Sequence, residues 1–210
     1  MNNSKITREP DLSQNLGLLI YNDNWAAQQN IYAVEVFETL FKSEKFDRVL
    51  EIGTSLGGLT FILHDIKTNL QQNFAIKSYD ILDRPVEYGR LRDLGVDVTV
   101  SNPFDIDYSN PKSDVIDFIR NEGRVLVLCD GGNKIKEFNC LSRFLKTNDV
   151  IMAHDYAFNS NDFEHNINRK YWNWHEISDS DISEACKTYS LAPFMQEEFS
   201  KAVWACRIKN

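Results

Sequence analysis

Residues 49–58 read VLEIGTSLGG, in which a mostly apolar run, interrupted by Glu51, is followed directly by three closely spaced glycines. Such an apolar run is typical of a strand that is covered on both faces of a sheet. Gly53, Gly57 and Gly58 then supply a tight turn, in which the backbone can approach a ligand closely before a helix begins. The segment therefore predicts a strand, a ligand-binding turn and a helix in succession.

The chain beyond this segment continues the same alternation. Short apolar runs rich in β-forming residues alternate with helical patterns, as expected for parallel strands that are joined by crossover helices. The predicted strands are Arg48–Ile52, Ala75–Tyr79, Val96–Val100, Val125–Cys129 and Asp149–Ala153. The pattern predicts an α/β fold, built on a Rossmann-like, doubly wound sheet that is mostly parallel.

The two ends of the chain depart from this alternation. Apolar residues recur at helical spacing between Leu16 and Phe41, which predicts an N-terminal helical extension. Near the other end, 174–177 and 201–208 resemble strands on either side of a helix that begins near Ser178. We expect these two strands to form an antiparallel hairpin at the edge of the sheet.

The overall composition excludes several classes of partner. A formal net charge of −8 disfavours nucleic acid, because the phosphate backbone would be repelled. No uninterrupted apolar run approaches the length of a membrane span, so we expect a cytoplasmic protein without a membrane partner. The four cysteines have no spacing suited to zinc and are expected to be reduced thiols in the core.

The acids around the turn indicate the kind of ligand. Glu51 precedes the turn, and Ser55 stands where a dinucleotide-binding loop has the glycine that admits a pyrophosphate. S-adenosylmethionine carries an ammonium and a sulfonium group and no phosphate, so this loop suits it better than NAD. Asp80 ends the second predicted strand, where a carboxylate can accept hydrogen bonds from both ribose hydroxyls. Asp83 is the competing candidate for that role.

Asn102 and Phe104 follow the third predicted strand. The amide of Asn102 is suited to the edge of an adenine base, and the ring of Phe104 to its face. A simple Asn-Pro turn that involves no ligand explains the same residues equally well. Both interpretations stay open at this point.

Four segments together resemble the class I S-adenosylmethionine-dependent methyltransferases, in the usual order of their motifs. They are VLEIGTSLGG at 49–58, YDI at 79–81, VLCD at 127–130 and IMAHDY at 151–156. Within that class the chain is most similar to small-molecule O-methyltransferases related to the cephalosporin hydroxylase family. The resemblance covers 48–156 and implies contacts with the cofactor in the glycine turn and at Asp80. The full set of expected cofactor contacts is Glu51, Gly53, Thr54, Ser55, Gly57, Gly58, Asp80, Ile81, Asn102, Phe104 and Asp130.

The resemblance also implies a divalent metal near Asp130 and Asp155. That family tends to have Asp-Ser-x-His after the fourth strand, where this chain has Asp130-Gly-Gly-Asn, and a second acid where this chain has His154. Carboxylates suit Mg²⁺, whereas an imidazole ligand favours Mn²⁺, iron or zinc. Either Asp130, His154 and Asp155 hold such an ion, or no metal is present.

Methyl transfer is an in-line displacement, so the enzyme mainly positions the acceptor and helps to remove its proton. His154 is the natural candidate for the base, because the ordinary pKa of histidine lies near neutrality and Asp155 is beside it. Lys134 is a second candidate. The residues between Phe158 and Trp174 either cap the acceptor pocket or pack as an outer helix.

We expect the 210 residues to form one methyltransferase domain. Residues 1–45 would form the helical extension, 46–156 the cofactor-binding core, and 157–210 the acceptor side with the C-terminal hairpin. The predicted function is transfer of a methyl group from S-adenosylmethionine to a hydroxyl of a small-molecule acceptor, with Mg²⁺ or Mn²⁺ as an optional second cofactor. The alternatives are a non-catalytic binding module and a nicotinamide-dependent oxidoreductase. The sequence leaves the oligomeric state open, including a homo-oligomer.

Overall fold

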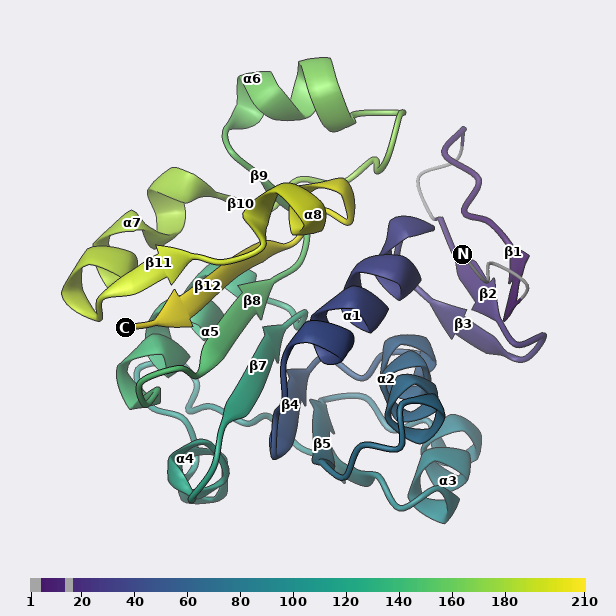
Figure 1. The fold of residues 1–210 in the computed structure, drawn as a ribbon, viewed down its shortest axis with the longest axis horizontal. Helices are drawn as coiled ribbons and strands as arrows, with labels where there is room; N and C mark the ends of the chain where they lie inside the picture. Colours follow the sequence, from purple (N-terminus) through teal and green to yellow (C-terminus); the bar gives the residue numbers. More distant parts are fainter. Residues whose placement is uncertain (1–4, 14–16) are drawn as a thin grey trace.

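A seven-stranded sheet forms the centre of the protein, in a computed structural model that describes residues 5–13 and 17–210 (Figure 1). From one edge to the other, its strands are β11 (Leu191–Pro193), β12 (Ala205–Lys209), β8 (Val150–Ala153), β7 (Val125–Cys129), β4 (Arg48–Ile52), β5 (Ala75–Asp80) and β6 (Asp97–Val100). The five strands predicted for the core are all present, and each lies within one residue of its predicted bounds.

The five core strands are parallel and lie in the order β6-β5-β4-β7-β8. Along the chain, the first strand of this sheet is β4 in the middle, and β5 and β6 follow on one side of it. The chain then returns and forms β7 on the other side of β4. Ligands of doubly wound sheets bind at this reversal, outside the carboxyl ends of the strands. Here the reversal lies between β4 and β7, where Gly53 and Asp130 follow the two strands.

Helices cover both faces of the sheet (Figure 1). One face carries α1 (Tyr32–Ser43), α2 (Gly58–Asn69), α3 (Pro85–Asp93) and α8 (Gln196–Lys201), and the other carries α4 (Ser113–Arg120), α5 (Lys134–Leu141) and α7 (Asp179–Thr188). Successive strand residues point to opposite faces, so Val49 and Leu50 of β4 belong to two different apolar cores. The structure confirms the predicted doubly wound α/β fold.

The N-terminal segment corrects one expectation, because its first α-helix among the described residues, α1, begins at Tyr32. Ahead of α1 lies a three-stranded antiparallel sheet, formed by β1 (Ile6–Arg8), β2 (Leu19–Tyr21) and β3 (Trp25–Ala27). In β2 and β3 every second residue is buried, which is the period of a strand and not of a helix. Asn22 and Asp23 have positive φ and form the turn between them. Leu16, where the helical pattern was expected to begin, lies outside the described residues.

The C-terminal hairpin is present, but one of its strands lies elsewhere than predicted, and the other begins at Ala205 because the predicted 201–208 starts within α8. β12 pairs antiparallel with β8 and with β11, so the partner in the hairpin is Leu191–Pro193 and not 174–177. Within 174–177 only Ile177 is in a strand, β10 (Ile177–Ser178), which pairs with the short β9 (Tyr156–Ala157) outside the main sheet. The helix predicted near Ser178 is α7, which begins with a capping box between Ser178 and Asp181.

Between β9 and β10 the chain forms α6 (Ser160–Asp162) and a π-helical turn (Phe163–Ile167), and a 3₁₀ turn (Ser142–Phe144) follows α5. All four cysteines are free thiols, and Cys129, Cys140 and Cys206 are buried. Among the described residues, none of the helices combines the length and the apolar character that crossing a membrane requires.

Candidate functional site

The turn after β4 requires glycine for conformation and for space. Gly53 has a φ of +96° and Gly57 a φ of +77°, values that residues with a side chain rarely adopt. A Cβ at Gly53 would overlap the backbone carbonyl of Asp130, because the two strand ends lie against each other at the reversal point. A Cβ at Gly58 would overlap the backbone of Ala26, which belongs to the N-terminal sheet. The turn is therefore packed tightly between β7 and that sheet.

Asp80, at the end of β5, holds the glycine turn in place. One carboxylate oxygen accepts a hydrogen bond from the backbone N–H of Ser55 at 2.7 Å, and the other accepts from the N–H of Leu82 at 2.8 Å. Each oxygen keeps a further lone pair for a ligand. Asp80 lines a cavity beside the turn, whereas Asp83 does not.

This first cavity gathers most of the residues that were expected to contact adenosine. It lies over the ends of β4, β5 and β7, on the side of the turn that faces β6. Its lining includes Gly53, Ser55, Asp80, Ile81, Asn102, Phe104 and Asp130 of the predicted set, together with Arg84, Tyr108 and Glu137, which were not predicted. Asn102 also bonds its own turn, since its amide oxygen accepts from the N–H of Phe104 at 3.0 Å.

Glu51 lies beneath the turn and lines neither cavity of the site. Its side chain is fully buried, and Oε2 accepts hydrogen bonds from the hydroxyls of Thr60 and Ser78, both at 2.5 Å. Oε1 has no partner. Burial raises the pKa of Glu51 to about 7, against the lowering effect of the two hydroxyls. The structure thus places Glu51 under the turn and not at the surface that a ligand would touch.

A second cavity lies on the other side of the turn and shares part of its wall with the first. Both cavities are lined by Gln28, Gly53, Ser55, Asp130 and Gly131. The second adds the predicted residues Thr54, Gly58, Lys134, His154 and Asp155, and also Gln29, Trp172, Trp174 and Glu176. Of the predicted cofactor contacts, only Glu51 and Gly57 line neither cavity.

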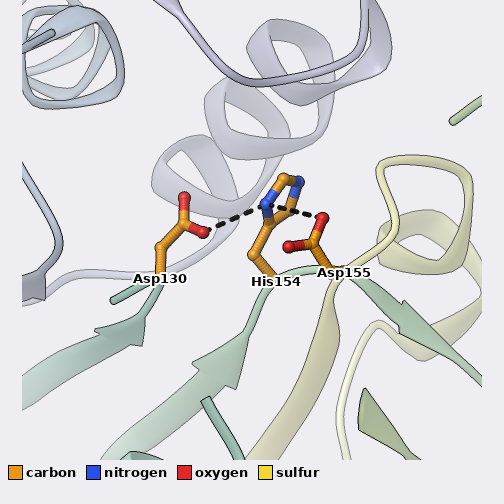
Figure 2. Close-up of side chains that lie close together, drawn as sticks. All are labelled: Asp130, His154 and Asp155. Carbon is orange, nitrogen blue, oxygen red and sulfur yellow. Dashed lines mark hydrogen bonds and ion pairs between the residues drawn. The ribbon is translucent and has the colours of Figure 1, made fainter. Parts of the chain in front are cut away.

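Asp130, His154 and Asp155 converge in the second cavity (Figure 2). Nδ1 of His154 lies 3.1 Å from Oδ1 of Asp130 and 3.4 Å from Oδ1 of Asp155. One ligand atom from each residue lies within 4.8 Å of the other two, so the three side chains form a group that could hold a metal ion. Burial disfavours the charged imidazole, but the two carboxylates outweigh burial and raise the pKa of His154.

Both imidazole nitrogens of His154 are enclosed. Nδ1 faces the two carboxylates, and Nε2 is buried without a hydrogen-bond partner among the described residues. The ring lies between two indoles, with its centroid 4.8 Å from that of Trp204 and 5.6 Å from that of Trp172. Neither nitrogen is therefore placed to take a proton directly from an acceptor in this arrangement.

Lys134, at the start of α5, is the positive partner of the acids. Its ammonium lies 3.0 Å from Oδ2 of Asp155 and 2.9 Å from Oε2 of Glu176, and it donates to the carbonyl of Gly131 at 3.2 Å. Burial disfavours its charge, but the acids, Asp130 first, outweigh burial and raise the pKa of Lys134. An ammonium whose three N–H groups are engaged is not available as a base. The structure therefore does not support that predicted role.

The aromatic segment 158–174 contributes to the site through two residues only. Trp172 and Trp174 line the second cavity, and Trp174 is 40% exposed. Trp172 donates its indole N–H to Oδ1 of Asp155 at 2.7 Å. Phe158 is exposed and lines neither cavity.

Two buried polar residues of the site were missed by the sequence analysis. Glu137 of α5 accepts hydrogen bonds from the N–H groups of Gly131 and Asn133, which orders the loop after Asp130. No capping-box pattern marks Glu137, because it follows the N-cap Asn133 by four residues and not by three. Gln29 donates to Asp130 at 2.9 Å, and no local pattern marks it.

Comparisons with known proteins place this geometry in context. No family model matches the chain, and none of the curated proteins matches it in sequence. Among solved structures, CmcI, of the cephalosporin hydroxylase-like group, superposes with a TM-score of 0.58 at 9% identity, covering 88% of this chain and 73% of CmcI.

Two further solved structures share the fold. The CMeT domain of a citrinin polyketide synthase has a TM-score of 0.52 at 13% identity and covers 84% of this chain, which spans about half (51%) of that structure. A protein from Staphylococcus aureus that is described as a caffeoyl-CoA O-methyltransferase has a TM-score of 0.50 at 12% identity, covering 84% of this chain and 82% of that one. At these identities the likeness concerns the fold. The protein has the fold of the class I S-adenosylmethionine-dependent methyltransferases, as the resemblance of its motifs implied.

Proposed function

We propose that the protein transfers the methyl group of S-adenosylmethionine to a hydroxyl of a small-molecule acceptor. The observation that carries this proposal is the shared wall of the two cavities at Gly53 and Asp130. A ligand whose adenosine lies in the first cavity, with its ribose at Asp80, would extend past Gly53 toward the second. Its methyl group would then face an acceptor that enters beside Trp174.

The glycine turn fits this cofactor for physical reasons. Gly53 lets the turn pack against the backbone of Asp130, so that the backbone of Gly53 lines both cavities, and the acids along the path suit an ammonium and a sulfonium group. Asp80 can bind the ribose diol with the lone pairs that Ser55 and Leu82 leave free. A dinucleotide would instead bring a pyrophosphate against Asp80 and Asp130, which disfavours the oxidoreductase alternative.

We propose further that Asp130, His154 and Asp155 hold a divalent ion. Two carboxylates and one imidazole form a donor set suited to Mn²⁺ or another transition-type ion more than to Mg²⁺. Such an ion, when bound, lowers the pKa of an acceptor hydroxyl and makes it a better nucleophile. His154 then serves as a ligand, which agrees with the direction of Nδ1 toward both carboxylates.

The remaining residues of the second cavity orient the acids. Lys134 binds Asp155 and Glu176, and Trp172 donates to Asp155, so that carboxylate is held from two sides. Lys134 also offsets part of the negative charge that three acids bring into one cavity. The proton of the acceptor would leave through solvent at the mouth of the cavity, where Trp174 is 40% exposed.

Thermal denaturation with candidate cofactors tests the proposal. A ligand of the native state at one hundred times its Kd adds about 2.7 kcal/mol of stability, which raises the Tm of a domain of this size by several degrees. We expect this shift with S-adenosylhomocysteine and not with NADH or ATP. An unchanged Tm at millimolar S-adenosylhomocysteine would contradict the proposal. If the protein binds S-adenosylmethionine but forms no S-adenosylhomocysteine with any hydroxylated acceptor in the presence of Mn²⁺, the result would instead favour the non-catalytic binding module.

A further inference from the structure

Gln29 connects the N-terminal segment to the acids of the site. It lies between β3 and α1, and its side chain is 1% exposed. Its amide nitrogen Nε2 donates to Oδ2 of Asp130 at 2.9 Å, and its amide oxygen accepts from the indole N–H of Trp204 at 2.9 Å. Three segments that are far apart in sequence therefore meet in one line of hydrogen bonds.

The chemistry of Trp204 fixes the orientation of the amide. An indole N–H can only donate, so the oxygen of Gln29 must face Trp204 and the NH₂ group must face Asp130. Asp130 consequently receives a hydrogen bond on Oδ2 from a group that has no freedom to turn. Oδ1 is left to face Nδ1 of His154, at 3.1 Å.

The backbone around Gln29 is anchored independently of this contact. The next residue, Asn30, is 2% exposed and donates its amide N–H to the carbonyl of Lys201 at 2.7 Å. Two residues earlier, Ala27 packs in the core, and the carbonyl of Ala26 lies against Gly58. Gln29 thus extends from a fixed backbone toward Asp130.

We infer that Gln29 is a positioning residue that fixes the Asp130 carboxylate, so that Oδ1 is presented to His154 and to the ion that the three residues bind. This inference rests on the proposed function, because Asp130 is a ligand only there. A group that hydrogen-bonds a metal ligand in this way sets the orientation of that ligand. Removing such a group typically weakens metal affinity by about tenfold to a hundredfold.

Mn²⁺ affinity of the full chain tests this role without any acceptor or turnover. We expect Gln29→Met, which keeps the volume of the side chain and removes both hydrogen bonds, to bind Mn²⁺ about tenfold or more weakly by calorimetry. The electron paramagnetic resonance spectrum of the bound ion should change as well, because it reports the symmetry of the ligands. Equal affinity and an equal spectrum in Gln29→Met and the parent protein would overturn the inference.

Gln196 supplies the matched control. Its amide oxygen accepts from the N–H of Cys206 in β12, and its amide nitrogen donates to the carbonyl of Trp204 just before that strand, but neither bond involves Asp130. Gln196→Met should therefore lower stability without changing the Mn²⁺ spectrum. A change of the same size in both variants would show that Gln29 acts only through general stability, and it would overturn the inference.

A second measurement separates this inference from the proposed metal site. If the parent protein binds no Mn²⁺, the metal part of the proposed function fails, and urea denaturation of Gln29→Met, Asp130→Ala and the double variant decides the role of Gln29. Contacting residues give non-additive losses of stability, whereas independent sites add. Non-additive losses would show that Gln29 holds Asp130 even without a metal, and additive losses would overturn the inference.

Discussion

Asp80 accepts a hydrogen bond from the backbone N–H of Ser55 at 2.7 Å, so the acid that ends β5 holds the glycine turn that follows β4. Ser55 has a φ of +49°, an uncommon conformation for a residue with a side chain, and this bond stabilises it. One side chain therefore both shapes the turn and lines the cavity proposed for adenosine. Changes at Asp80 should affect cofactor affinity through both routes.

We predict that Asp80→Ala lowers the affinity for S-adenosylhomocysteine by about ten- to a hundredfold. The variant loses one to two hydrogen bonds to the ribose, at about 1–3 kcal/mol, and its turn is less well held. Calorimetry measures the effect. Asp83→Ala is the matched control, since Asp83 does not line the cavity and should bind as the parent protein does. If Asp83→Ala bound S-adenosylhomocysteine more weakly than Asp80→Ala does, the ribose contact would be assigned to Asp83 instead.

Gly53→Ala should destabilise the fold and abolish cofactor binding. The new Cβ would meet the backbone of Asp130, which cannot move aside without disturbing β7, and the φ of +96° is strained for alanine. We expect a loss of at least about 2 kcal/mol in urea denaturation. Gly89→Ala in α3 is the control, because nothing lies near its Cβ, and it should be neutral or stabilising by up to about 1 kcal/mol. Equal stability of the two variants would contradict the tight packing at Gly53.

The sequence was sufficient to predict the parts of the site that depend on local pattern. The apolar residues and the glycine spacing at 49–58 are specific enough to predict a strand followed by a tight turn. Asp80 was predicted as a site residue because it comes at the end of the next strand. The resemblance of the motifs implied that Asp130 and Asp155 share a site, and they do lie together because the carboxyl ends of adjacent parallel strands meet at one edge.

The features that depend on contacts distant in sequence could not be predicted in this way. Gln29 approaches Asp130 only because the N-terminal sheet packs on α2 through Gly58, and its own neighbours in sequence carry no signal. The ion pairs of Lys134 with Asp155 and Glu176 likewise join three separate segments. The same limit explains the N-terminal error, since the short strands around Trp25 are stabilised by pairing with one another and not by local propensity.

Mn²⁺ affinity should rise with pH through the neutral range. The pKa of His154 is raised above its ordinary value because Asp130 and Asp155 outweigh burial, so a proton competes with the ion for Nδ1. Below that pKa, binding must release the proton and is weaker. Above it, binding no longer depends on pH through this residue. Calorimetry in buffers of different ionisation enthalpy measures the released proton, and His154→Ala should abolish this proton release. Binding of Mn²⁺ with no pH dependence would remove His154 from the ligand set.

The stability of the ligand-free protein should fall as pH rises from about 5 to about 8, and Glu51→Gln should reduce that fall. Burial raises the pKa of Glu51 from 4.5 to about 7, so the folded state holds a proton that the unfolded state has already released. Below pH 4.5 both states are protonated and burial of Glu51 carries no charge penalty. The penalty grows between the two pKa values and is fully present above pH 7, where it reaches about 3 kcal/mol.

Glutamine is neutral throughout and can still accept hydrogen bonds from Thr60 and Ser78. Urea denaturation at pH 5, 6.5 and 8 measures the difference between the two proteins, with the exposed Glu122→Gln as the control for the change in net charge. A parallel decline in the parent protein and Glu51→Gln would show that Glu51 is already ionised at pH 5 and that its two hydroxyl donors outweigh its burial.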